Sequence, residues 1–283
     1  MKIFIQHRDN LQYARNLISA IREHAEVQEG SPTEDCTHFL SLQTGGEDQM
    51  LGIRESIPEA KITTYCWDCY EWIWDHTYMF DWRPFGEQCK ASDLVMVPSY
   101  GQVMRLNQHW GIEEARTMIV PAYAQLFDYD DIADDGYVCD PLRDIPDRHS
   151  GWASRACNEL NIPYIRVGNT RSWEEYQWII AHSSFVICPW YEASTGGMSL
   201  IEAYNLGKDV LVCDSPYMGA KEYFKERAYY FDPSYESMKQ QILNMWENRG
   251  SHNEDLQDRK DFCRHEFGIS TMAKSIVEAL EEQ

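Results

Sequence analysis

Short apolar segments alternate with helix-like segments along most of this chain, and this alternation limits its fold more than any other feature. Residues 2–6 and 93–99 are typical of the apolar segments, whereas residues 11–25 carry apolar side chains at the spacing of one helical face. Strands separated by helices pair in parallel and are covered by helices, so we expect an α/β protein. Further strands are expected at 37–43, 61–67, 116–123, 137–141, 164–168, 185–190, 209–214 and 229–233. Further helices are expected at 100–110, 151–160, 172–183, 199–207 and over the last fifty residues.

The alternation is interrupted once, by an acidic segment with few apolar residues between Tyr123 and Gly136. We interpret this segment as a hinge between an N-terminal Rossmann-like domain, residues 1–125, and a C-terminal Rossmann-like domain, residues 126–283. The final helix is a candidate to pack back on the N-terminal domain. Doubly wound domains bind ligands at the carboxyl ends of their strands, so two of them would form a binding cleft where those ends face each other.

The charge of the chain limits its partners. It has 25 Lys and Arg against 46 Asp and Glu, a formal net charge of −21. Such a surface repels nucleic-acid phosphates and anionic lipid unless basic residues gather locally, although acidity that only maintains solubility explains it as well. No segment approaches the roughly 18 apolar residues that cross a bilayer, and the N-terminus does not have the pattern of a signal peptide. We expect a cytoplasmic protein without a membrane partner, and its oligomeric state stays open.

A turn rich in small residues precedes an expected helix in the second half. Residues 190–207 read WYEASTGGMSLIEAYNLG. The unpaired N–H groups and the dipole of a helix start attract anions, and Gly196 and Gly197 let a bulky group approach the backbone. The same pattern also fits an ordinary strand-to-helix turn.

Two arginines, Arg143 and Arg148, follow the expected strand at 137–141. A guanidinium group offers forked donors to phosphate oxygens, so the pair predicts a diphosphate clamp. Surface ion pairs with Asp144 and Asp147 are the alternative explanation.

Residues from about 90 to 235 resemble glycosyltransferase family 4, the retaining enzymes of the GT-B fold. In that family an Arg is followed five residues later by a Lys, and a Glu-Gly-x-Gly turn precedes a helix that carries a Glu-Ala pair. Arg143 and Arg148 fall on the two basic positions, Gly197 falls on the second glycine, and Glu202 falls on the glutamate of the pair. The order and spacing of these residues make the resemblance specific, whereas residues 1–60 share only the general pattern.

The resemblance implies a metal-independent, retaining transfer of a sugar from a nucleoside diphosphate sugar to an acceptor hydroxyl, with no cofactor. Arg143 and Arg148 would hold the diphosphate and stabilise it as the leaving group. Glu202 would accept hydrogen bonds from the ribose hydroxyls. The other implied donor-binding residues are Ser194, Thr195, Gly196, Gly197, Met198, Ser199, Asn169 and Thr170.

Two departures from the family pattern affect the catalytic residues. The first motif glutamate would fall on Ser194, so either a two-residue insertion carries Glu192 into the site or Ser194 replaces the glutamate. A His-Asp pair of the family's N-terminal domain is here Trp67-Asp68, so Asp68 or the nearby His7 would take the place of the histidine. Glu192 and Asp68 are therefore candidate catalytic residues.

Aromatic residues crowd the segment between Tyr65 and Trp82. They form either core packing or an acceptor platform, since sugars and bases stack on aromatic faces. The first strand also ends at polar residues that could face a cleft. The candidate acceptor-binding residues are His7, Arg8, Trp67 and Trp72.

Three functions stay open. We expect a small molecule, glycan or protein hydroxyl as the acceptor, because the net charge opposes duplex DNA. A compact chain of this kind also suits a phage enzyme that acts on hydroxymethylated DNA bases. The third is a non-catalytic nucleotide-sugar-binding protein, suggested by the missing histidine and the displaced glutamate.

We expect no metal site. Cys66 and Cys69 form a lone CxxC without enough further ligands nearby for structural zinc. Asp128 and Asp130 form an Asp-x-Asp that resembles a manganese motif, yet they lie in the acidic segment and not after an apolar strand.

Overall fold

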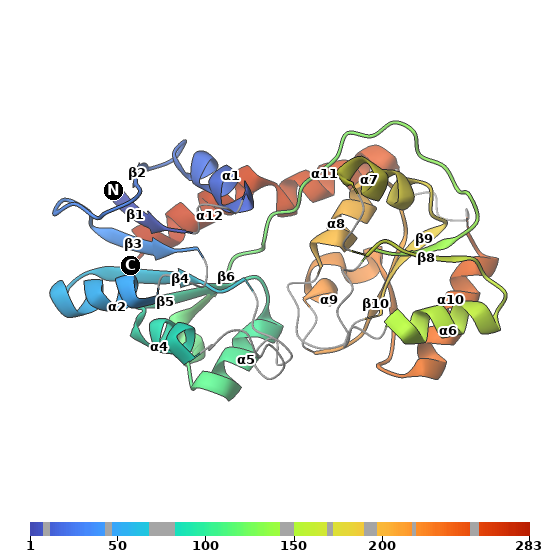
Figure 1. The fold of residues 1–283 in the computed structure, drawn as a ribbon, viewed down its shortest axis with the longest axis horizontal. Coiled ribbons are helices and arrows are strands. Elements are labelled where there is room, and N and C mark those ends of the chain that lie inside the picture. The colour runs from blue at the N-terminus through green and yellow to red at the C-terminus, as the bar shows by residue number, and fades with distance from the viewer. Residues whose placement is uncertain are drawn as a thin grey trace. The chain divides into compact units, whose positions relative to one another are not determined.

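The computed structural model describes residues 1–7, 12–42, 47–67, 83–141, 150–168, 172–189, 197–216, 219–249 and 255–283. The chain divides into two compact units. Unit 1 comprises Met1–Tyr123 together with Ile269–Gln283, and unit 2 comprises Ala124–Gly268. Figure 1 shows a central sheet with flanking helices in each unit.

Unit 1 is built on a six-stranded parallel sheet in the order β2-β1-β3-β4-β5-β6. Its strands are β1 (Lys2–Gln6), β2 (Glu26–Gln28), β3 (His38–Ser41), β4 (Lys61–Tyr65), β5 (Leu94–Val97) and β6 (Thr117–Ile119). Its helices are α1 (Gln12–Ile21), α2 (Glu47–Ser56), α4 (Arg83–Ala91), α5 (Tyr100–Trp110), the 3-10 helix η1 (Glu114–Arg116) and α12 (Ile269–Glu281).

Alternate side chains of the unit 1 strands supply two apolar layers. Ile3 and Ile5 of β1 belong to the layer beneath α1 and α12, whereas Phe4 belongs to the layer beneath α2. This alternation is the period of two expected of a strand that is covered on both faces. Helix α12, from the end of the chain, packs directly against α1 (Figure 1).

Unit 2 is built on a five-stranded parallel sheet in the order β11-β10-β9-β7-β8. Its strands are β7 (Val138–Asp140), β8 (Tyr164–Arg166), β9 (Phe185–Cys188), β10 (Val210–Cys213) and β11 (Tyr229–Phe231). Its helices are α6 (Ser150–Glu159), α7 (Trp173–Ala181), α8 (Met198–Asn205), α9 (Ala220–Phe224), the 3-10 helix η2 (Lys225–Arg227), α10 (Tyr235–Glu247) and α11 (Leu256–Phe267). Apolar residues of α6 and α10 cover one face of the sheet. Helix α8 packs against α11.

The strand order reverses once in each sheet. In unit 1 the chain turns back between β1 and β3, and in unit 2 it turns back between β7 and β9. At such a switch point the connections after the two central strands leave toward opposite faces of the sheet, which opens a crevice at the strands' carboxyl ends. A ligand site of unit 2 is therefore expected just beyond the carboxyl ends of β7 and β9.

The expected α/β class, with two doubly wound parallel sheets, is confirmed. The strand predicted at 2–6 and the helix predicted at 100–110 form with those bounds. Strand β2 was not predicted, because it has only three partly exposed residues at the edge of its sheet and carries neither an apolar run nor an alternation. No described helix combines the length and apolar character that crossing a bilayer requires.

The acidic segment predicted as a hinge is held against unit 2 by hydrogen bonds. The Ala133 N–H donates to the Ala181 carbonyl over 3.1 Å. The buried Lys208 ammonium donates to the carbonyls of Ala133, over 2.6 Å, and Ser183, over 2.9 Å. Burial lowers the pKa of Lys208 to about 8.

Candidate functional site

Helix α8 begins beside the switch point of unit 2, after strand β9 has reached the carboxyl edge of the sheet. Gly197 is its N-cap residue, with a φ of 78°, a conformation that favours glycine. No side chain of the described residues caps this helix start, and Met198 at its first position is 45% exposed. The first N–H groups of a helix have no intrahelical partner, so the start of α8 offers backbone donors to a ligand.

Glu202 lies one turn into α8 and is only 7% exposed. The Tyr176 hydroxyl donates to its Oε2 over 2.6 Å. Burial raises the pKa of Glu202 to about 7, and the hydrogen bond from Tyr176 acts in the opposite direction. Among the described residues, Oε1 of Glu202 accepts no hydrogen bond. A largely buried carboxylate with one oxygen that no described residue engages is a ready acceptor for a hydroxyl group of a ligand.

A closed ring of contacts holds this carboxylate in place. The Tyr176 ring stacks on Trp173, with centroids 5.2 Å apart and an interplanar angle of 10°. Trp173 and Phe127 make a T-shaped contact, with ring centroids 5.0 Å apart. The Asn205 side chain, three residues after Glu202 on α8, donates to the Phe127 carbonyl over 2.8 Å. The ring thus links α7, the acidic segment and α8 in one supporting unit.

Strand β7, on the other side of the switch point, ends in a fully buried acid, Asp140. The Tyr164 hydroxyl donates to Asp140 Oδ2 over 2.8 Å. Burial and the adjacent carboxylate raise the pKa of Tyr164 well above its ordinary value. Asp140 stands just before the segment that contains Arg143 and Arg148.

The structure describes some of the predicted site residues and not others. Gly197, Met198, Ser199 and Glu202 come together on the first turns of α8. The predicted residues outside the described part of the chain are Arg8, Asp68, Trp72, Arg143, Arg148, Asn169, Thr170, Glu192, Ser194, Thr195 and Gly196. The prediction did not include Tyr176, Asn205 or Asp140. Only the last of these carried a signal, as a carboxylate that ends an apolar strand.

His7 follows β1 at the switch point of unit 1. Its Nε2 lies 2.6 Å from Oε2 of Glu29, which also pairs with Arg22. Burial acts to raise the pKa of Glu29, but the hydrogen bonds from His7 and Arg22 bring it below its ordinary value. The His7 Nδ1 is buried, and no described residue hydrogen-bonds to it. His7 therefore has one ring nitrogen that is paired with Glu29 and one buried ring nitrogen that has no partner among the described residues.

Trp67 follows β4 and is partly buried in an aromatic group. Its ring meets Tyr65 at 4.6 Å and Tyr13 at 5.0 Å, and its indole N–H donates to the Leu42 carbonyl. These contacts favour packing over an acceptor platform at this one position. Most of the remaining aromatic segment lies outside the described residues.

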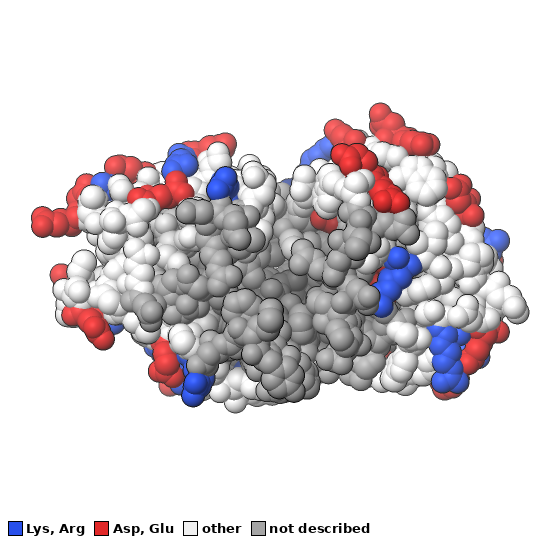
Figure 2. All heavy atoms as spheres, viewed as in Figure 1, with Lys and Arg blue, Asp and Glu red and all other residues white. Residues whose placement is uncertain are grey.

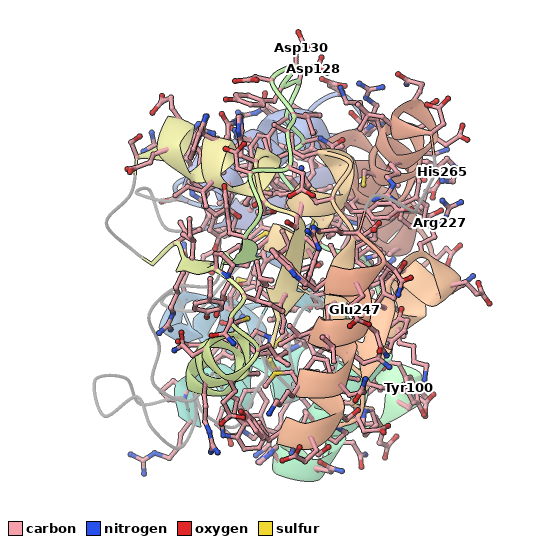
Figure 3. All side chains as sticks on the ribbon, turned by 90° about the vertical axis from the view of Figure 1, so that its right-hand side faces the viewer. Tyr100, Asp128, Asp130, Arg227, Glu247 and His265 are labelled. Atoms are coloured by element: carbon pink, nitrogen blue, oxygen red, sulfur yellow. The ribbon has the colours of Figure 1, made fainter. Side chains whose placement is uncertain are left out.

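The Asp-x-Asp pair lies at the outer edge of unit 2 (Figure 3). Asp128 Oδ1 is 3.3 Å from the Lys260 ammonium and 3.9 Å from the Arg264 guanidinium. Within the described ranges, no three His, Cys, Asp or Glu side chains converge as a metal site would require. Asp128 acts there as a partner of cations on α11.

No family model matches this chain, and no curated protein sequence matches it. Solved structures do match. A glycosyltransferase from Rickettsia africae ESF-5 aligns over 99% of this chain and 98% of its own, with 12% identity and a TM-score of 0.66. Anabaena Alr3699/HepE in complex with UDP aligns over 100% of this chain and 99% of its own, with 12% identity and a TM-score of 0.70. Sucrose-phosphate synthase from Thermosynechococcus elongatus aligns over 99% of this chain and 98% of its own, with 10% identity and a TM-score of 0.72.

These structures are GT-B glycosyltransferases, and the predicted GT-B fold is confirmed by them. At 10–12% identity the similarity concerns the fold. Membership of glycosyltransferase family 4 stays a prediction.

Proposed function

We propose that this chain is a glycosyltransferase that uses a nucleoside diphosphate sugar as its donor. The observation that carries the proposal is the buried carboxylate of Glu202, which has one oxygen without a hydrogen bond from any described residue. It lies one turn from a helix start that no described side chain caps, beside the switch point of a GT-B domain. Such a carboxylate suits the hydroxyls of a ribose, and such a helix start suits a phosphate. Alr3699/HepE was crystallised with UDP, with UDP and glucose, and with UDP-glucose, which makes UDP-glucose the first donor to test.

The diphosphate would lie at the start of α8, against the backbone of Gly197, Met198 and Ser199. We propose from the family resemblance that Arg143 and Arg148 supply the positive charge that this acidic protein needs to hold and release a diphosphate. The reaction would then be retaining and would need no metal or other cofactor. Glu192 and Ser194 stay alternative partners for the donor sugar, and the loop from Asn169 to Ser172, after β8, is the proposed neighbour of the base.

The proposed acceptor is a hydroxyl group of a small molecule, glycan or protein. With a net charge of −21, the chain repels duplex DNA. On the described part of the face in Figure 2, Lys and Arg side chains lie singly or in small groups among more numerous Asp and Glu side chains. His7 and Asp68 are the proposed acceptor-side residues of unit 1.

Donor binding and sugar transfer test the proposal in one series. A ligand at 100 times its dissociation constant stabilises the folded protein by about 2.7 kcal/mol, so UDP and UDP-glucose should raise the melting temperature in a panel of nucleotides. Labelled UDP-glucose should then lose its sugar to water or to an acceptor, at the same rate with and without EDTA. The anomeric configuration of the product, read by NMR, tests retention.

Each outcome of this series decides a point. The absence of stabilisation by any nucleoside diphosphate would refute the proposed function. Stabilisation with no sugar release would identify a nucleotide-sugar-binding protein instead. Incorporation of labelled sugar into hydroxymethylated DNA would overturn the proposed acceptor class.

A further inference from the structure

The Glu202 carboxylate is held by a side chain from a neighbouring helix, which the sequence did not reveal. Tyr176 of α7 donates its phenol proton to Oε2 of Glu202 over 2.6 Å. The Ser199 hydroxyl of α8 interacts with the same phenol. Because Ser199 and Glu202 are both predicted donor-binding residues, Tyr176 meets the candidate site at two points.

No described cation neutralises Glu202. Helix α11 packs against α8, but its two buried cations pair elsewhere. The Arg259 guanidinium lies 2.7 Å from Asp209, and the Lys260 ammonium lies 3.3 Å from Asp128. Among the described side chains, the hydrogen bond that stabilises the ionised form of Glu202 therefore comes from Tyr176.

Among the described residues, other buried titratable groups on α8 and the elements around it are three thiols and the phenol of Tyr204, to which Arg227 donates a hydrogen bond. Cys263 of α11 donates to the Ile201 carbonyl over 3.7 Å. Cys188 and Cys213, which end strands β9 and β10, are fully buried. Burial raises the pKa of Cys213 to about 12, so this thiol carries no charge at neutral pH. The ionisation of Glu202 thus depends on its burial and on Tyr176.

We propose that Tyr176 is a positioning residue for the ribose of the donor: its phenol fixes Oε2 of Glu202, favours the ionised carboxylate, and leaves Oε1 to accept a ribose hydroxyl. The inference rests on the proposed function of the site. Its geometric support is the ring of contacts through Trp173, Phe127 and Asn205, which holds the phenol at the carboxylate. A tyrosine that only filled space would not need its hydroxyl.

The inference predicts a pH effect. The pKa of Glu202 is about 7 while Tyr176 donates to it. A hydrogen bond to a charged group is worth about tenfold or more in an ionisation constant, so Tyr176→Phe should raise this pKa by about one unit or more. At pH 7.0 the ionised fraction would fall from about one half to about one tenth, and UDP would bind about fivefold more weakly. At about pH 9 the variant should recover most of the wild-type affinity, because its carboxylate is then mostly ionised.

Two measurements on the full chain test the inference. The first is a carbon-13 NMR titration of the Glu202 carboxyl group in the ligand-free protein, assigned by its loss in Glu202→Gln. The second is calorimetric binding of UDP from pH 5.5 to 9, where the ionisation of UDP itself is common to all variants and cancels in their ratio. Tyr137→Phe is the matched control, because the Tyr137 hydroxyl donates to the Ile179 carbonyl of the same helix α7, over 2.7 Å.

We expect Tyr176→Phe to raise the pKa of Glu202 and to shift the acid limb of UDP binding upward by the same amount, while Tyr137→Phe shifts neither. An unchanged Glu202 titration in Tyr176→Phe would overturn the inference. So would a loss of UDP affinity that is equal at every pH, because a purely structural role predicts that result. If the wild-type protein bound no UDP at any pH, the proposed function would be refuted. The carboxyl titration would still test whether Tyr176 lowers the pKa of Glu202.

Discussion

Replacing Glu202 by glutamine should change how the stability of the protein depends on pH. The folded-state pKa of this carboxyl is about 7, above the ordinary 4.5 that it recovers in the unfolded chain, because burial disfavours the ionised form. The group therefore contributes its full stability below pH 4.5 and loses that contribution as the pH rises through about 7. At about 1.4 kcal/mol for each unit of pKa, the total is about 3 kcal/mol.

About 2 kcal/mol of this change falls between pH 5.5 and pH 8.0, a range that avoids the isoelectric point of about 4.7. Glutamine does not titrate, so the free energy of unfolding of Glu202→Gln, relative to wild type, should rise by about 2 kcal/mol over this range. Any constant effect of the new amide beside Tyr176 cancels in that difference.

Urea denaturation of both proteins at the two pH values, without ligand, measures this quantity. Glu247→Gln is the control, since Glu247 is exposed at the end of α10 (Figure 3), and its difference from wild type should be nearly the same at both pH values. If the difference between Glu202→Gln and wild type did not change with pH, the carboxyl would titrate alike in the folded and unfolded states. The argument that burial raises the pKa of Glu202 would then be refuted.

Three further variants test separate parts of the site. Gly197→Ala places a Cβ at a φ of 78° and should lower the free energy of unfolding, measured by urea denaturation, by about 1–2 kcal/mol. Gly151→Ala is the control and should not destabilise the protein, because a Cβ there meets nothing within 4 Å. Equal effects of the two changes would contradict the conformational role of Gly197. Asn205→Ala leaves the Phe127 carbonyl without its hydrogen bond from Asn205 and should lower the free energy of unfolding by about 1–3 kcal/mol. An unchanged stability would show that the ring of contacts does not support the Glu202 carboxylate. Arg143→Ala and Arg148→Ala should each lower turnover by about 100-fold, and wild-type turnover in both would remove the proposed clamp.

The local signals in the sequence were sufficient for most elements of both sheets. A strand covered on both faces, such as β9 or β10, is a short apolar run wherever it occurs, so its sequence alone marks it. Strand β2 forms because β1 offers an edge to pair with, and helix α2 has a weakly apolar sequence that only the unit 1 core completes. Such elements form because of the elements that they pack against, so their own sequences do not predict them.

In the candidate site, too, the sequence predicts residues that share one segment but not contacts between separate elements. Gly197 and Glu202 lie five residues apart on one turn and helix, so a motif can contain both. Tyr176 precedes Glu202 by 26 residues and meets it only because the chain crosses from β8 to β9 and places α7 beside α8. No spacing rule predicts which polar side chain of α7 would face which residue of α8. Contacts between separate elements need the folded structure.

Helix α8 also suggests how an acidic protein can bind an anionic donor without repelling it. Its positive N-terminal end and its buried carboxylate are separated by about 6 Å along the axis, four residues at about 1.5 Å each. A diphosphate at the helix start would meet N–H donors, and a ribose further along would meet an acceptor, so each part of the nucleotide would find its complement. The reverse orientation would bring phosphate against carboxylate. In the proposed function, one short helix would therefore both bind the donor and set its direction, and Tyr176 would hold the buried carboxylate at the ribose end.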